Sequence, residues 1–240
     1  MVIRRAPLRR RELSPWCRSA TVITAAEPVI GDSRGSLTAT DHDARDHLGM
    51  AESSLTPPHQ DLTDGVIRLR LFGAEDAQWV AVACQDSLIP RFTFMDEGLS
   101  PEGAAEWIQK SKERWLTGNG RFAIVECDSN RPLGQIGLGV PFIQLTGEVY
   151  YWLIPEARGK GMATRAVGLI ADWGFDSVGI ERLTLLAHPE NAKSQRVAIR
   201  CGFTREGVLR AYEPIKGTRP DLVSWSLLPS DPRPWNQQPG

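Results

Sequence analysis

A short basic stretch that contains glycine, RGKGMA at residues 158–163, has residue types that suit an anion site. It follows an apolar, aromatic run (YYWLIP) and opens a segment with helical spacing. A helix N-terminus offers unpaired backbone N–H groups, and glycine lets phosphate approach the main chain because it has no Cβ. The stretch therefore predicts a pyrophosphate-type site at Gly159 and Gly161. Arg158 and Lys160 would add positive charge at its rim. On these residues alone, a basic helix start after a tight turn explains the pattern equally well.

The spacing separates this stretch from two common phosphate-binding patterns. It is neither the G-x-G-x-x-G of a dinucleotide site nor the G-x-x-x-x-G-K-[ST] of a P-loop. It resembles R/Q-x-x-G-x-G/A, the acetyl-CoA loop of the GCN5-related N-acetyltransferases (GNAT), with Arg158, Gly161 and Ala163 at the specified positions. The resemblance implies acetyl-CoA as cosubstrate. It assigns cofactor binding to the loop and helix start, namely Arg158, Gly159, Lys160, Gly161, Met162, Ala163 and Thr164.

A second motif, about thirty residues further on, is similar to the same family. It reads N-x-x-S-x-x-V from Asn191 and G-F-T-R-E-G-V-L-R from Gly202, as in the branch that includes ribosomal-protein N-terminal acetyltransferases. Residues 221–227 resemble the family's D-x-x-x-x-x-L ending. The resemblance covers roughly residues 62–228. It implies the GNAT fold and transfer of an acetyl group to a primary amine, directly within a ternary complex and without a protein nucleophile.

The resemblance also assigns cofactor contacts outside the loop. In the family, backbone groups of the preceding strand bind the pantetheine arm, and one N–H polarises the thioester. The matching positions are Trp152, Leu153 and Ile154. A core strand explains these residues too, and both interpretations can hold because only the backbone is used. Asn191 resembles the family asparagine that contacts the cofactor, and it also suits a helix N-cap.

Proton transfer requires further groups, because the amine must lose a proton and the thiolate must be stabilised or protonated. The tyrosine that serves as acid in many relatives falls at Ala198, a departure from the family pattern. Ser194 stands where the ribosomal-type branch has a serine proposed to assist the leaving group, with simple helix packing as the alternative. Two carboxylates, Glu213 and Glu148, occupy positions where different branches carry a catalytic glutamate. The sequence leaves open which of them is the base.

The missing tyrosine favours one other class of function. It is a non-catalytic acyl-CoA-binding or interaction module that retains the same fold. The intact loop and the two candidate bases favour an enzyme instead. For an enzyme, the acceptor is expected to be a peptide N-terminus or a small-molecule amine.

Composition sets the remaining bounds. The chain has 240 residues, of which 41% are hydrophobic and 24% charged, which suits one sizeable soluble domain. A net charge of −1 gives no electrostatic case for nucleic acid, and no apolar run approaches the roughly eighteen residues of a membrane span. The four cysteines and four histidines show no metal-ligand spacing, so we expect no metal and a reducing cytoplasm. The sequence does not distinguish a monomer from a homodimer.

The chain divides into three parts by composition. Residues 1–60 carry five arginines within the first eleven positions and then lack sustained periodicity, so we expect a disordered extension. A transit peptide and a mis-assigned start, with Met50 as the true first residue, are alternatives. Residues 61–229 are expected to form the acetyltransferase domain, and residues 230–240 a disordered tail.

Periodicity within the domain predicts a mixed α/β fold with a mostly antiparallel central sheet flanked by helices. Strands are expected near residues 65–72, 121–126, 133–140, 148–154, 183–187, 208–212 and 221–227. Helices are expected at residues 75–83, 101–116, 161–175 and 191–201, with an irregular segment at 90–94. Trp107 and Trp115 lie at helical spacing and can share a face, where they either shape the acceptor site or belong to the core.

Overall fold

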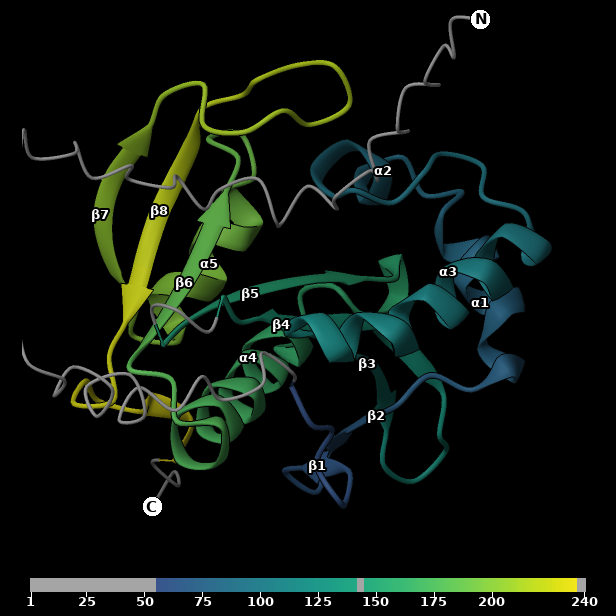
Figure 1. Ribbon diagram of the computed structural model, residues 1–240, viewed down its shortest axis with the longest axis horizontal. Coiled ribbons are helices and arrows are strands. Elements are labelled where there is room, and N and C mark those ends of the chain that lie inside the picture. Colours follow the sequence, from purple (N-terminus) through teal and green to yellow (C-terminus); the bar gives the residue numbers. More distant parts are fainter. Residues whose placement is uncertain (1–54, 142–144, 237–240) are drawn as a thin grey trace, which may run out of the picture. The chain divides into compact units, whose positions relative to one another are not determined.

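The structure is a computed structural model, and it describes residues 55–141 and 145–236. In this part of the chain, eight strands form one sheet in the order β1-β2-β3-β4-β5-β6-β8-β7 (Figure 1). The strands are β1 (Leu62–Thr63), β2 (Ile67–Arg70), β3 (Asn119–Glu126), β4 (Pro132–Gly139), β5 (Thr146–Leu153), β6 (Arg182–Ala187), β7 (Thr204–Leu209) and β8 (Leu222–Leu227). The prediction of a mixed, mostly antiparallel sheet flanked by helices is confirmed.

Local signals explain where the helices begin. Ser100 Oγ accepts a hydrogen bond from Gly103 N at 3.1 Å, and Pro101 takes the first helical position. Asn191 caps a later helix in the same way, through Ser194 N at 3.1 Å. The helices of the described ranges are α1 (Ala77–Ala83), α2 (Leu88–Phe92), α3 (Pro101–Arg114), α4 (Met162–Trp173) and α5 (Ala192–Arg200), with short 3-10 turns and a π turn at Gly174–Val178.

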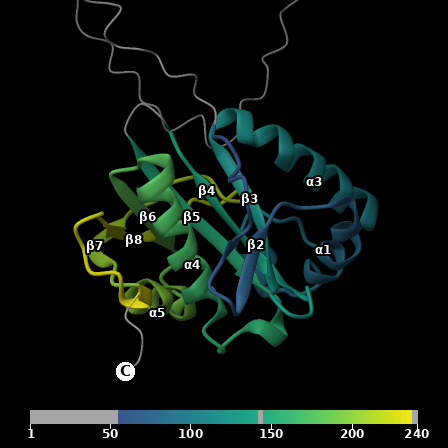
Figure 2. The ribbon, with the colours of Figure 1, turned by 90° about the horizontal axis from the view of Figure 1, so that it is seen from below.

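The sheet carries helices on both faces (Figure 2). Side chains alternate along β3, so Phe122 and Ile124 join the core beneath α4. Ala123 and Val125 point the other way and pack with α1 and α3. Each functional side chain on a strand therefore belongs either to the α4–α5 face or to the α1–α3 face.

β5 and β6 form the one parallel pair of neighbouring strands in the described sheet, and they separate part of the way along. β4 stays paired with β5 as far as Leu153. β6 pairs with β5 only from Thr146 to Val149 and then turns away from it (Figure 1). Because β8 continues to pair with β6 as far as Ala187, the sheet opens between β5 and β6 rather than ending there.

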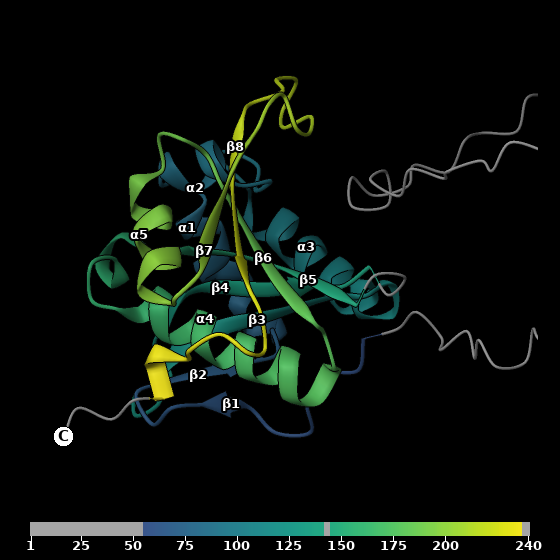
Figure 3. The same cartoon turned by 90° about the vertical axis from the view of Figure 1, so that its left-hand side faces the viewer.

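Two local predictions are wrong. The segment expected to be irregular at 90–94 includes most of α2, and Thr93 Oγ1 donates to Ile89 O at 2.6 Å where this helix ends. The strand expected at 208–212 is β7, which begins earlier because β8 satisfies its backbone from Thr204 to Leu209. The loop after it, residues 210–221, projects beyond the ends of its strands (Figure 3).

Trp107 and Trp115 do not share a face. Trp115 lies in the core beneath α4, edge-on to Phe122 with ring centroids 5.2 Å apart. Trp107 packs edge-on to Phe72 at 5.3 Å on the α1–α3 face. The two diverge because residues eight positions apart point about 80° away from each other around an α-helix.

The described domain begins earlier than residue 61. Leu55 is only 4% exposed and packs in the larger core. Its backbone N–H donates to Trp115 O at 2.9 Å. The prediction of a disordered extension up to residue 60 is therefore wrong for residues 55–60, because an apolar side chain there completes the core. Residues 1–54 lie outside the described residues.

The domain also extends beyond residue 229. Trp235 covers Gly168 of α4, where a Cβ would lie 2.7 Å from the indole ring. Its Nε1 donates to Asp172 at 2.9 Å, and Arg233 forms an ion pair with the same carboxylate at 2.9 Å. The predicted disordered tail does not hold as far as residue 236, and residues 237–240 lie outside the described residues.

Candidate active site

The backbone of β5 offers unpaired groups at the point where β6 leaves it. Ile154 N donates to Leu133 O of β4 at 2.9 Å, which sets the alternation of this antiparallel pair. Every second residue bonds to β4, so Tyr151 and Leu153 direct their N–H and C=O groups to the opposite side. Past Val149, no strand of the described ranges covers that side. The gap between β5 and β6 is thus lined by backbone donors and acceptors.

The three strand positions predicted to bind the pantetheine arm differ in what they offer. Leu153 faces the gap, and because its C=O accepts from Arg158 Nε at 3.0 Å, its N–H is the group left for a ligand. Ile154 and Trp152 direct their backbone groups to β4 instead. The Trp152 side chain is buried on the α1–α3 face. Tyr151, which the sequence analysis missed, is the second gap-facing position, and strand alternation identifies it once the pairing with β4 is known.

Arg158 holds the loop in place instead of extending from it. Its guanidinium forms a bidentate ion pair with Asp86, at 2.6 and 3.1 Å, in addition to its bond to Leu153. These hydrogen bonds hold the pKa of the Asp86 carboxyl below its usual range. Lys160 is exposed and forms no ion pair with a described residue, so it is the loop cation available at the rim.

The start of α4 has the open backbone that an anion requires. Gly159 and Gly161 adopt left-handed conformations with φ of +77° and +82°, and no atom lies within 4 Å of the position that a Cβ would take. Arg165 N is the first amide to bond within the helix, to Gly161 O at 3.1 Å. The preceding helical N–H groups therefore have no intrahelical partner, namely those of Met162, Ala163 and Thr164.

Asn191 and Ser194, which the sequence predicts, meet Tyr151 near the N-terminus of α5. Asn191 Oδ1 accepts from Ser194 N, so the expected cap is present. Ser194 Oγ of α5 lies 3.1 Å from the hydroxyl of Tyr151 on β5. Burial raises the pKa of Tyr151, so its phenol stays protonated at neutral pH. Ala198, where the family tyrosine would fall, is fully buried one turn further along α5.

The two candidate bases lie close to each other on the opposite side of the sheet. Glu148 is half-buried on β5, and Glu213 belongs to the loop after β7. Burial, and then the negative charge of Glu213, raise the pKa of Glu148 to about 8. Burial also raises the pKa of Glu213. A carboxyl group with a pKa near neutrality can accept a proton during turnover and release it again.

A buried polar network adjoins Glu148, and the sequence analysis did not predict it. Tyr150 follows Glu148 by two residues and so points from the same face of β5. Its hydroxyl donates to Asn119 Oδ1 at 2.6 Å and accepts from Arg121 Nε at 3.3 Å. Arg121 also donates to Ser111 Oγ of α3 at 3.2 Å. An arginine inside an otherwise apolar strand was the available signal, but its partners depend on the tertiary structure.

The segment around α2 links three parts of the site. At its start, Asp86 holds the loop that follows β5. Arg91 forms an ion pair with Glu190, at 2.6 Å, in the loop after β6. Lys216, in the loop that carries Glu213, donates to Pro90 O at 2.5 Å. The segment from Asp86 to Arg91 therefore contacts the loop before α4, the loop after β6 and the loop that carries Glu213.

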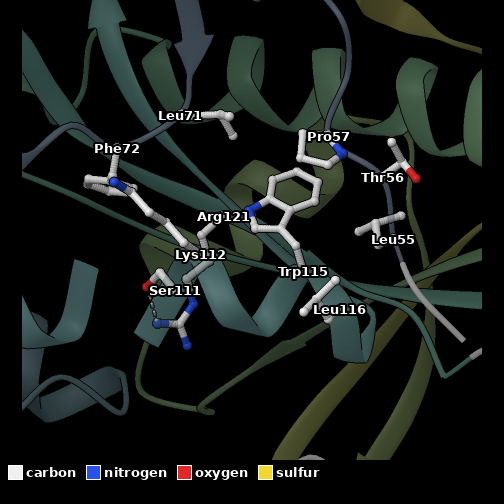
Figure 4. A pocket seen from close by; sticks show the side chains of 10 residues that line it. All are labelled: Leu55, Thr56, Pro57, Leu71, Phe72, Ser111, Lys112, Trp115, Leu116 and Arg121. Carbon is white, nitrogen blue, oxygen red and sulfur yellow. Dashed lines mark hydrogen bonds between the residues drawn. The ribbon is translucent and has the colours of Figure 1, made fainter. Parts of the chain in front are cut away.

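The described ranges contain two cavities, and neither is lined by the facing edges of β5 and β6. One of about 380 Å³ lies where β2 ends, between residues 55–57, α3 and Arg121; Figure 4 shows Ser111 bonded to Arg121 at its edge. Another of about 380 Å³ lies between α1 and residues 154–156, next to Asp86. The carboxylates Glu148 and Glu213 line neither cavity.

The two buried cysteines, Cys84 and Cys201, do not suit nucleophilic catalysis. Burial raises the pKa of Cys84 to about 11 and that of Cys201 to about 12, so both remain thiols at neutral pH. Among residues 55–141 and 145–236, no group of three or more His, Cys, Asp or Glu side chains is placed to hold a metal ion. In the same ranges, no helix combines the length and the apolar character that crossing a membrane requires.

Comparison with known proteins agrees with this fold. The family model described as acetyltransferase (GNAT) domain matches residues 67–204. The chain belongs to the GNAT acetyltransferase family, and the sheet that opens between β5 and β6 is consistent with that fold. It is an N-acetyltransferase by these relationships.

The similar proteins include relatives by sequence and solved structures. The uncharacterized N-acetyltransferase p20 of Bacillus licheniformis is 30% identical over 165 residues, which cover 68% of this chain and 92% of the relative. Spermidine N(1)-acetyltransferase of Escherichia coli (strain K12) is 28% identical over 144 residues, which cover 60% of this chain and 75% of the relative. The solved structure of Mycobacterium smegmatis RimJ in complex with CoA-disulfide has a TM-score of 0.62 at 22% identity. The match covers 69% of this chain and 83% of that structure's chain. At that identity, the structural likeness supports the fold.

Proposed function

We propose that this protein transfers the acetyl group of acetyl-CoA to a primary amine, directly and within a ternary complex. The observation that carries the proposal is the end of β5–β6 pairing at Val149. Beyond it, the backbone of Tyr151 and Leu153 faces an open gap that leads into the loop before α4. A pantetheine arm has amide groups that pair with such a strand edge, and its pyrophosphate suits free N–H groups at a helix start.

Acetyl-CoA fits the residues at the start of α4. The open space at Gly159 and Gly161 allows phosphate oxygens to reach the main chain. The amides of residues 162–164 can then donate to those oxygens, and Lys160 adds charge at the rim. Asn191 Nδ2 is a further donor on the α5 side of the gap. Arg158 contributes indirectly, because its ion pair with Asp86 fixes the position of the loop.

The base in this proposal is Glu148. The attacking amine nitrogen forms a bond to the thioester carbon, and its proton passes to the Glu148 carboxylate, directly or through water. Because its pKa is about 8, Glu148 binds this proton more readily than an exposed glutamate does. Glu213 raises the proton affinity of Glu148 through its charge. This division of roles replaces the open choice between two equivalent bases.

The leaving group departs on the other side of the gap. The carbon–sulfur bond breaks as the amide forms, and the CoA thiolate takes a proton. Tyr151 carries a protonated hydroxyl 3.1 Å from Ser194 Oγ. We assign the donation to Tyr151, with Ser194 orienting its hydroxyl, and the phenolate then recovers a proton from water. Tyr151 thereby supplies from β5 the group that the family pattern would place at residue 198.

A direct test combines cofactor and acceptor measurements. Purified protein with acetyl-CoA and a panel of peptides and small amines should release one CoA per acetylated amine, measured by thiol titration and mass spectrometry of the acceptor. Without an acceptor, the protein should release no burst of CoA, because no protein group becomes acetylated. If acetyl-CoA binds in calorimetry but no acceptor is modified, the protein is a non-catalytic acyl-CoA-binding module, and the proposal fails.

A further inference from the structure

Arg121 is a buried cation without a counter-ion among residues 55–141 and 145–236. Its side chain is 7% exposed, and its hydrogen-bond partners, Ser111 Oγ and Tyr150 Oη, are neutral. The guanidinium stacks between two rings, with its carbon 4.9 Å from the centroid of Trp107 and 5.8 Å from that of Tyr150. No carboxylate of the described residues lies within the 4.0 Å of an ion pair. Buried charges in proteins are ordinarily paired, so this arrangement is costly unless a ligand supplies the anion.

Arg114 lies beside Arg121, and no described carboxylate pairs with it either. Trp107, Ser111 and Arg114 follow each other at i, i+4 and i+7 along α3, so they share the face that covers the sheet. Arg114 is half-buried and, within the described ranges, forms no ion pair and no side-chain hydrogen bond. Burial and the nearby positive charge of Arg121 lower its pKa. Two adjacent guanidinium groups thus face Tyr150 with their charge uncompensated.

The position of this pair relative to Glu148 indicates what would compensate it. Glu148 and Tyr150 point from the same face of β5 and lie roughly 7 Å apart along the strand. An anionic group a few bonds from an amine held at Glu148 can therefore extend along β5 towards Tyr150, which Arg121 contacts. Arginine binds carboxylate and phosphate oxygens through paired hydrogen bonds, and a buried guanidinium that stacks on aromatic rings is already oriented for this.

We propose that the acceptor is an acidic amine: a primary amine that carries an anionic group a few bonds from its nitrogen, as in a peptide N-terminus followed by an acidic residue. The amine binds at Glu148 and the anion binds at Arg114 and Arg121. This inference rests on the proposed acetyl transfer and specifies its substrate class. It excludes a polyamine as the preferred acceptor, because a second cation would meet two arginines.

The test compares peptides that differ by one charge. Two tetrapeptide amides with an N-terminal alanine carry glutamate or glutamine at the second position, and a third carries lysine; spermidine serves as the polycation. The wild-type protein should acetylate the glutamate peptide with a kcat/KM roughly tenfold or more above that of the glutamine peptide, as expected for charge-assisted hydrogen bonds. Lysine peptide and spermidine should be slower still.

The variants assign the preference to the arginines. In Arg114→Gln and in Arg121→Met, the ratio between glutamate and glutamine peptides should fall towards one through a higher KM, while the KM for acetyl-CoA stays unchanged. Lys112→Gln removes the same charge from an exposed position of α3 and should keep the ratio. Melting temperatures identify loss of folding, and if Arg121→Met unfolds, the partly exposed Arg114→Gln decides.

The outcomes separate this inference from the proposed function. Equal rates for the two peptides, or faster acetylation of spermidine, overturn the acidic acceptor and leave acetyl transfer standing. If no amine is acetylated, the proposed function fails, and calorimetry with the Nα-acetylated peptides then tests the arginine pair by itself. Tighter binding of the glutamate peptide supports an anion site there, and equal binding removes it.

Discussion

Glu148 is the residue whose protonation should control the rate. Its pKa of about 8 exceeds the usual 4.5 because of burial and the nearby Glu213. Since a base must be deprotonated, kcat/KM of the wild-type protein should rise as pH increases through about 8. Glu148→Gln should lower kcat/KM by roughly 10²–10⁴-fold and remove this rise. The measurement is a pH profile at saturating acetyl-CoA, with calorimetry to show unchanged acetyl-CoA affinity.

Glu213→Gln is the matched comparison for that profile. Removing a like charge lowers the pKa of Glu148, so the rising limb should shift to lower pH with a smaller loss of rate. If Glu213→Gln abolishes turnover while Glu148→Gln does not, Glu213 is the base. If neither substitution matters, solvent deprotonates the amine and catalysis depends on positioning alone.

Substitutions of Tyr151 test the proposed protonation of the CoA thiolate. Tyr151→Phe removes the hydroxyl 3.1 Å from Ser194 and should lower kcat by roughly 10²-fold, the lower end of the usual range for general acid catalysis. Ser194→Ala should cost less, because the serine only orients that hydroxyl and water can protonate a thiolate of ordinary pKa. Steady-state kinetics with both single variants and the double variant measures this. A Tyr151→Phe protein as fast as the wild type would contradict the assignment.

At the scale of a single element, the start of α4 is defined by its glycines. Gly161→Leu should abolish acetyl-CoA binding, because the side chain would occupy the open space next to the free amides. It should also lower the melting temperature, since a residue with a side chain is disfavoured at φ of +82°. Isothermal titration with acetyl-CoA and thermal unfolding measure the two effects.

Gly179 provides a control for the backbone strain. It has φ of +79°, with no atom within 4 Å of its would-be Cβ, and it follows the π turn away from the loop. Gly179→Leu should therefore reduce stability in a similar way while acetyl-CoA affinity stays unchanged. Equal affinity losses in both variants would mean that strain, and not an occupied phosphate site, explains the Gly161 result.

At the scale of the whole molecule, the domain needs residues that precede its first strand. A chain that begins at Met50 should match the full-length melting temperature, whereas one that begins at Asp61 should melt lower because it lacks Leu55. Burial of a leucine contributes about 1.5–3 kcal/mol, which corresponds to a decrease of roughly 3–12 °C for a domain of this size. Leu55→Ala in the longer chain should reproduce most of the decrease. Equal melting temperatures for both truncated chains would contradict a core role for Leu55.

Local sequence patterns predict most strands and helices of this fold. The alternation along residues 121–126 and the Ser-Pro-Glu start at residue 100 predict β3 and α3, and the structure contains both. The glycine spacing at 159–161 identifies the loop before α4 for the same reason, because a turn and a helix start depend on neighbouring residues. Residues 90–94 carry no such pattern, and α2 was missed because its contacts with Lys216 and Glu190 are distant in sequence.

The sequence by itself determined the family and the loop at residues 158–164, because both rest on contiguous motifs. It also indicated Asn191 and Ser194 within the second motif, and Glu148 and Glu213 by their positions relative to the motifs. Tertiary structure alone decided what these groups contact. Arg158 pairs with Asp86, 72 positions away, and Tyr151 meets Ser194 across 43 positions. It also placed Arg121 next to Tyr150, on the same face as Glu148. The physical reason is that strand pairing and helix packing bring distant residues together, and no local pattern records which strand a given backbone N–H will bond.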